Sequence, residues 1–139
     1  MNTFRLSYLR SLVAAFAFVT FAVFATPVSA KEPIKIGFGM ALTGGLAGGG
    51  KQSLVGMEMW ADDINKKGGI LGRPVKLIYY DDQTKASTVP GIYAKLLDVD
   101  KVDFVVSGYG TNLIAPAMSL VKQRDIVFMG LFGMDCNKK

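Results

Sequence analysis

The sequence contains no histidine and only one cysteine, Cys136, among its 139 residues. Without histidine, a His-based metal site, a Ser-His-Asp triad and a Cys-His pair are all excluded, and most hydrolytic chemistry is excluded with them. A single cysteine cannot form an internal disulfide, so an apolar core must hold the fold together. We therefore assign no catalytic residue, no metal site and no cofactor.

The sequence also lacks a concentrated patch of charge. It has 16 Lys+Arg and 11 Asp+Glu, a net charge of +5, and Arg5 and Arg10 contribute two of the positive charges. From residue 31 onward the balance is 14 − 11 = +3, and the basic residues are scattered, with only Lys66-Lys67 and Lys138-Lys139 adjacent. This pattern indicates a solvated surface and predicts no nucleic-acid partner.

The first 30 residues have the pattern of a secretory signal peptide. Two arginines precede an uncharged apolar run of 15 residues, 11–25, and Val28 and Ala30 form a cleavage site of the A-x-A kind. The alternative is an uncleaved membrane anchor, but the run is shorter than the ~20 residues that a spanning helix needs. We predict cleavage between Ala30 and Lys31, export to the periplasm, and one structural unit over residues 31–139.

The remaining sequence alternates between strand and helix patterns. We predict strands at 34–38, 75–80, 102–106 and 126–129, and helices at about 54–67, 87–98 and 113–123. Ser53 is the expected N-cap of the first helix and Gly68-Gly69 its stop, while Pro90 and Pro116 are expected in the first turns of the other two helices. This order predicts an α/β fold with a parallel sheet and helices on both faces.

In such a sheet, ligands bind beyond the carboxyl ends of the strands. The prediction places four segments on that edge: residues 44–50, Asp81-Asp82, residues 109–112 and residues 132–134. Asp81 and Asp82 are adjacent in a strand and point to opposite faces, so turn or cap formation is favoured over an acid/base pair. Thr111 and Asn112 have two open interpretations, as N-cap residues or as hydrogen-bond partners of a bound zwitterion.

Five of the seven residues 44–50 are glycine, which predicts a loop before the first helix. Residues 45–52 almost match the phosphate loop G-x-x-x-x-G-K-[ST], but Gln52 stands where the Mg²⁺-binding hydroxyl belongs. Gly48-x-Gly50 is also a weak dinucleotide signal, because Ser53 replaces the third glycine. Two interpretations remain besides a nucleotide site: a carboxylate or small-anion site at a helix N-terminus, or a surface loop without a ligand.

The chain resembles the leucine/isoleucine/valine-binding branch of the type I periplasmic binding proteins, the substrate-binding proteins of ABC importers. The resemblance rests on I-K-I-G-F at 34–38, A-L-T-G-G-L-A-G-G-G-K-Q at 41–52, I-N-K-K-G-G-I-L-G-R at 64–73 and D-D at 81–82. It implies two α/β lobes that close on an amino acid or similar solute and deliver it to a membrane permease. The resemblance therefore leads us to expect a protein that is not an enzyme. Relatives are more than twice as long, so residues 31–139 are expected to form a partial N-terminal lobe.

The resemblance also implies site residues. The segment Tyr109-Gly110-Thr111-Asn112 matches the one that binds the α-carboxylate and amine of the ligand, and Phe132-Gly133-Met134 matches the segment after the fourth strand. Gly49 lies near the position where some members carry an aromatic residue over the ligand. Because Gly49 has no side chain and residues 132–134 lack hydroxyls, we expect a different or larger ligand, such as an amide or an aromatic compound.

Two other functions are compatible with the pattern. A ligand-sensing receptor module could have the same fold, and a nucleotide-binding α/β protein could use the glycine run. A small-molecule solute and an ABC permease are the partners that the favoured interpretation predicts.

Overall fold

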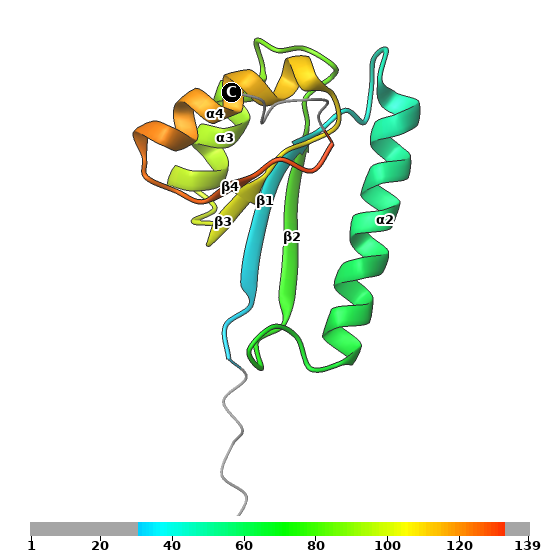
Figure 1. Ribbon diagram of the computed structural model, residues 1–139, viewed down its shortest axis with the longest axis vertical. Coiled ribbons are helices and arrows are strands. Elements are labelled where there is room, and N and C mark those ends of the chain that lie inside the picture. Colours follow the sequence, from blue (N-terminus) through cyan, green and yellow to red (C-terminus); the bar gives the residue numbers. More distant parts are fainter. Residues whose placement is uncertain (1–30, 133–139) are drawn as a thin grey trace, which may run out of the picture. The chain divides into compact units, whose positions relative to one another are not determined.

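The computed structural model describes residues 31–132 (Figure 1). Strands and helices alternate along the chain, as predicted. The elements are β1 (Ile34–Met40), α2 (Ala47–Lys66), β2 (Val75–Asp81), α3 (Val89–Asp98), β3 (Phe104–Val106), α4 (Thr111–Gln123) and β4 (Phe128–Met129). Within the described residues, no helix has the combined length and apolar character that crossing a membrane requires.

The four strands form one parallel sheet in the order β2-β1-β3-β4. Ile34 pairs with Val75 at the start of β1, and Met40 pairs with Asp81 at its end. The chain therefore leaves β1 for β2 on one side and returns past β1 to reach β3 on the other side. The predicted α/β fold with a parallel sheet is confirmed.

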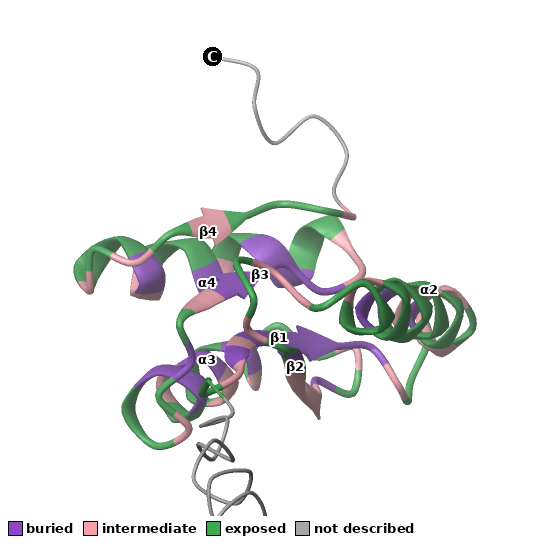
Figure 2. Ribbon diagram, turned by 90° about the horizontal axis from the view of Figure 1, so that it is seen from below, coloured by how far each residue is buried: buried purple, intermediate pink, exposed green. Residues whose placement is uncertain are grey.

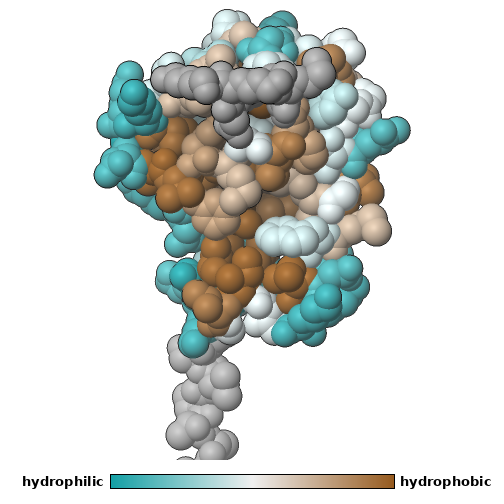
Figure 3. All heavy atoms as spheres, viewed as in Figure 1, coloured by the Kyte–Doolittle hydropathy of each residue, from teal (hydrophilic) through white to brown (hydrophobic). Residues whose placement is uncertain are grey.

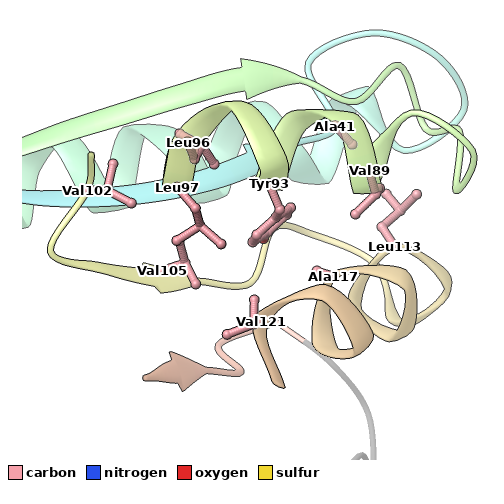
Figure 4. Close-up of a cluster of buried hydrophobic side chains, with 10 residues drawn as sticks. All are labelled: Ala41, Val89, Tyr93, Leu96, Leu97, Val102, Val105, Leu113, Ala117 and Val121. Atoms are coloured by element: carbon pink, nitrogen blue, oxygen red, sulfur yellow. The ribbon is translucent and has the colours of Figure 1, made fainter. Parts of the chain in front are cut away.

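Apolar cores lie on both faces of the sheet. In Figure 2, α2 lies on one side of β1 and β2 while α3 and α4 lie on the other side. The core on the α3 and α4 side consists of Ala41, Val89, Tyr93, Leu96, Leu97, Val102, Val105, Leu113, Ala117 and Val121 (Figure 4). The core under α2 consists of Ile34, Ile36, Phe38, Met40, Met57, Ala61, Val75 and Val106. Val105 and Val106 enter opposite cores because successive strand residues alternate between faces.

An apolar groove extends over the sheet beside α2. Its apolar lining comes from Ile36, Met57, Trp60, Ile70, Leu77, Phe104, Val106, Met129, Leu131 and Phe132, and it encloses about 550 Å³. α2 packs against β2 and β1, so among the described elements no helix covers β3 and β4 on this face. Figure 3 shows apolar side chains gathered in the middle of the molecule, where this groove opens.

α2 begins earlier than predicted. The expected N-cap was Ser53, but the helix begins at Ala47 after the N-cap residue Leu46, and Ser53 lies inside it. Three glycines of the predicted loop are therefore helical, against a propensity cost of about 1 kcal/mol for each relative to alanine. Close packing accounts for two of them: a Cβ atom at Gly50 would lie only 1.9 Å from the carbonyl oxygen of Ala41, and one at Gly49 would lie 2.4 Å from Cζ of Tyr109, whereas Gly48 has open space around it. The predicted stop is correct: Gly68 and Gly69 have φ values of +96° and +79°.

α4 also begins earlier than predicted. It extends from Thr111 rather than from Leu113, with Gly110 as N-cap at φ +118°, so Pro116 lies in the second turn and not in the first. Thr111 and Asn112 are consequently first-turn residues and not the N-cap. Thr88 is the N-cap residue of α3, without a side-chain capping hydrogen bond, and Pro90 lies in the first turn as expected. β3 and β4 are shorter than the apolar runs that predicted them.

Candidate functional site

The candidate site lies at one edge of the sheet, which we call the carboxyl edge. All four strands are parallel, so their carboxyl ends meet there. Three connections that follow β1, β3 and β4 lie at this edge: residues 41–46, 107–110 and 130–132. In open α/β sheets this is the edge at which ligands bind.

Asp81, at the end of β2, holds the connection that follows β1. Its Oδ1 atom accepts hydrogen bonds from the backbone N–H groups of Leu42 at 3.0 Å and Thr43 at 3.1 Å, and its Oδ2 atom accepts one from the Thr43 hydroxyl at 2.6 Å. The Thr84 hydroxyl donates to the Thr43 carbonyl at 2.8 Å and accepts from Leu46 N–H at 3.2 Å. These contacts fix the chain immediately before α2. They were not predicted, because they join residues about 40 positions apart.

Burial and hydrogen bonding act differently on the two adjacent carboxyl groups. Partial desolvation of Asp81 would raise its pKa, but its hydrogen bonds from Thr43, Gln83 and Leu42 outweigh this and lower the pKa. Burial raises the pKa of Asp82, which accepts one hydrogen bond from Thr84 N–H at 2.8 Å. Both groups therefore serve the fold, as the sequence analysis favoured, and they do not form an acid/base pair.

The N-termini of α2 and α4 lie side by side at the carboxyl edge. A Cβ atom at Gly110, the N-cap of α4, would lie 2.8 Å from Cδ1 of Leu46, the N-cap of α2. Neither helix has a side-chain hydrogen bond at its N-cap. The positive ends of two helix dipoles therefore lie near each other, an arrangement that favours a carboxylate or other anion. The N–H groups of Leu46 and Ala47 are already engaged, by the Thr84 hydroxyl and the Gly44 carbonyl.

Ser107 hydrogen-bonds the connection that follows β3 to the connection that follows β4. This residue is fully buried, and its Oγ atom accepts hydrogen bonds from Leu131 N–H at 2.8 Å and Phe132 N–H at 3.5 Å. Its own N–H donates to the Met129 carbonyl at 2.8 Å. The sequence patterns predict no role for Ser107. The available signal was a hydroxyl residue placed directly after an apolar strand.

Tyr109 contacts two other predicted site residues, Phe132 and Gly49. It forms an isolated parallel bridge with Phe132, and the two ring centroids are 6.4 Å apart at an interplanar angle of 47°. The Tyr109 ring also lies against Gly49: a Cβ atom there would meet the Tyr109 Cζ atom at 2.4 Å. Gly49, Tyr109 and Phe132 are thus brought together, although they come from three separate parts of the chain.

The remaining predicted site residues divide into two groups. Thr111 and Asn112 are exposed in the first turn of α4, next to Gly110. Gly133 and Met134 lie outside the described residues.

The nucleotide interpretation of the glycine run does not fit the structure. A phosphate loop places its lysine at the start of a helix, after a loop that cradles the phosphates. Here α2 begins at Ala47, so Lys51 lies in its second turn, and Gln52 is exposed further along the helix. For metals, no group of three or more His, Cys, Asp or Glu side chains within residues 31–132 is arranged to hold an ion.

A sequence profile described as periplasmic binding protein matches residues 33–138. The Leu/Ile/Val-binding protein of Escherichia coli K12 is 28% identical over 98 residues, which cover 70% of this chain and 26% of that protein. The chain thus spans about a quarter of the length of this relative.

Solved structures share the fold. A possible leucine/isoleucine/valine-binding protein from Rhodopirellula baltica superposes with a TM-score of 0.70 at 30% identity, covering 78% of this chain and 29% of that one. A solute-binding protein of an ABC transporter from Rhodopseudomonas palustris, in complex with 3,4-dihydroxybenzoic acid, superposes with a TM-score of 0.65 at 24% identity. The match covers 73% of this chain and 27% of that one.

Proposed function

The chain belongs to the periplasmic binding protein family, and we propose that residues 31–132 form one wall of the solute site in the binding component of an ABC importer. The wall holds a small carboxylate-bearing solute, an amino acid or related compound, without changing it chemically. The solute then passes to a membrane permease. The Leu/Ile/Val-binding relatives favour this role over that of a sensor module of the same fold.

One observation carries the proposal: the adjacent N-termini of α2 and α4 at Leu46 and Gly110, with the Tyr109 and Phe132 rings beside them. The helix ends supply N–H donors for a carboxylate, and the rings supply an apolar surface for the body of the solute. Thr111 and Asn112 are well placed in the first turn of α4 to add side-chain hydrogen bonds. We include Gly49 in the site because the Tyr109 ring packs against it.

The test is a titration of the ¹⁵N-labelled chain with branched-chain amino acids, amides and benzoates. A single wall is expected to bind weakly, with a Kd in about the millimolar range, or about −4 kcal/mol. Shifts should concentrate on the N–H signals of Gly48, Gly49 and residues 110–112, since the N–H groups of Leu46 and Ala47 are already bonded within the chain. An alcohol analogue such as isoleucinol serves as the control, because it lacks the carboxylate and should cause no such shifts. If no solute perturbs these signals, the proposal is wrong.

Members of this family are periplasmic binding proteins, and we extend the location to this chain through the predicted signal peptide at residues 1–30. Expression in a Gram-negative host followed by osmotic shock should release the chain, with Lys31 as its first residue. N-terminal sequencing measures this directly. Retention in the membrane fraction with an intact N-terminus would instead favour the anchor alternative.

A further inference from the structure

Gly49 and Tyr109 fit each other sterically. A Cβ atom at Gly49 would lie 2.4 Å from Cζ, 2.5 Å from Cε1 and 2.7 Å from Oη of Tyr109, all far inside van der Waals contact. Gly49 is helical and has no positive φ, so its backbone conformation does not demand glycine. The preceding Gly48 has nothing within 4 Å of such a Cβ atom. The ring of Tyr109 is therefore the group that any side chain at position 49 would have to displace.

The Tyr109 ring is held in place while its hydroxyl is left available. The ring packs against the core under α2 and against Phe132. Tyr109 is partly exposed, and its hydroxyl has no hydrogen-bond partner among the described residues. Because the residue is partly exposed, water can hydrate this hydroxyl in the free protein, and a bound molecule can replace that water. At the carboxyl edge, a bound molecule can supply that partner.

The same wall offers no free anion to an ammonium group. Residues 44–50, 107–112 and 130–132 contain no charged side chain. The carboxylate at this edge, Asp81, already accepts four hydrogen bonds, two of them from Thr43 and the others from Leu42 and Gln83. The wall therefore combines N–H donors with two aromatic rings, and it provides no carboxylate to neutralise an α-amino group.

We propose that Tyr109 is the specificity-determining residue of this wall, and that it selects a planar aromatic carboxylate over an aliphatic α-amino acid. The helix N-termini bind the carboxylate, the Tyr109 ring contacts the flat body of the solute, and the Tyr109 hydroxyl bonds a polar ring substituent. This inference rests on the proposed function, because it refines which solute the same site accepts.

The test compares three probes, benzoate, 3,4-dihydroxybenzoate and isoleucine, by NMR titration of the full chain. The wild type should bind 3,4-dihydroxybenzoate at least about 5-fold more tightly than isoleucine, since one hydrogen bond of about 1 kcal/mol gives that factor. Tyr109→Phe should weaken 3,4-dihydroxybenzoate about 5-fold and leave benzoate unchanged. Tyr79→Phe is the matched control: its hydroxyl bonds Glu58 at 3.0 Å, on a different part of α2, and its loss should change no affinity.

Two further variants keep the test decisive. Tyr109→Leu should remove the preference for aromatic probes, and Gly49→Trp combined with Tyr109→Gly should restore it by supplying the ring from α2. The inference is overturned if the wild type binds isoleucine as tightly as the benzoates, or if the ratio of affinities survives in Tyr109→Leu. In both cases the proposed function stands, because a solute is still bound. If none of the three probes binds, the proposed function and this inference are both wrong.

Discussion

The side chain of Asn65 hydrogen-bonds both backbone polar groups of Val75. Val75 N–H donates to Oδ1 of Asn65 at 2.7 Å, and Nδ2 of Asn65 donates to the Val75 carbonyl at 2.9 Å. On the opposite side of β2, Ile34 N–H donates to the Pro74 carbonyl at 2.7 Å, so the groups of Val75 point away from β1. Asn65 therefore takes the place of a neighbouring strand at the first residue of an edge strand, where unpaired groups invite association.

Replacing this carboxamide should loosen the start of β2. We expect Asn65→Ala to lower the free energy of unfolding by about 1–2 kcal/mol, since two hydrogen bonds are lost. Urea denaturation measures the change, and hydrogen exchange at the Val75 amide should quicken in parallel. Asn65→Asp is the matched variant, because it keeps an acceptor for Val75 N–H but loses the donor to the Val75 carbonyl. Its free energy of unfolding should lie between those of the wild type and Asn65→Ala. Equal stability of Asn65→Ala and wild type would refute the edge role.

Two glycines of α2 should respond in opposite directions to the same substitution. A Cβ atom at Gly48 has open space around it, so Gly48→Ala should stabilise the chain by about 0.5–1 kcal/mol through helix propensity. At Gly50 the new atom would lie 1.9 Å from the Ala41 carbonyl oxygen, and Gly50→Ala should cost about 2–4 kcal/mol. Thermal unfolding of both variants provides the comparison. Similar effects at both positions would contradict the placement of the helix start.

The stabilising effect of Asp81 should depend on pH. Its pKa in the folded chain is lowered, so its contribution is fully present above the pKa of the unfolded carboxyl group, which is about 4, and is lost as the pH falls through the folded value. We expect Asp81→Asn to be less stable than wild type at pH 7 by about 1–2 kcal/mol. The two proteins should converge once the pH falls below the lowered pKa of the folded Asp81 carboxyl group. Urea denaturation across this range would show a constant difference if the carboxylate were irrelevant.

A buried hydroxyl joins α3 to β3. Tyr93 is 1% exposed, and its hydroxyl donates to the Val106 carbonyl at 2.7 Å. Burial raises the pKa of this group, so it stays a neutral donor throughout the physiological range. Tyr93→Phe should lower stability by about 1–2 kcal/mol, because a buried carbonyl loses its partner.

Tyr79→Phe serves as the comparison for Tyr93→Phe, since its hydroxyl bonds Glu58 at the surface and should be worth less than about 0.5 kcal/mol. The difference between the two variants can be read from chemical denaturation curves. If both substitutions had the same small effect, the buried hydrogen bond would contribute nothing.

The parallel sheet and its helices were predictable because hydrophobic periodicity is a local property. The stripe that includes Met57 and Ala61 is buried in the core under α2, as its spacing predicts. The glycine stop at Gly68-Gly69 was likewise readable, since αL residues end helices. These features need only neighbouring residues to be interpreted.

The start of α2 was not predictable in that way. Ser53 had the chemistry of an N-cap, and the glycines before it had the chemistry of a loop. What places them in a helix is packing against Ala41 and Tyr109, residues that sequence patterns do not connect to positions 50 and 49. The same limit applies to the candidate site. The sequence suggested which residues belong to it, but the contact between the Tyr109 ring and Gly49 could be found only from the folded structure.

The apolar groove beside α2 determines how the chain behaves in solution. Three large apolar side chains along it are about half exposed: Trp60 at 43%, Met129 at 53% and Leu131 at 43%. Exposing this apolar surface to water is unfavourable for the monomer. Self-association relieves that cost, and it becomes more favourable as the concentration rises. The sedimentation coefficient and the thermal unfolding midpoint of the chain should consequently change with protein concentration. Solubilising additives that bind the apolar groove should reduce this concentration dependence.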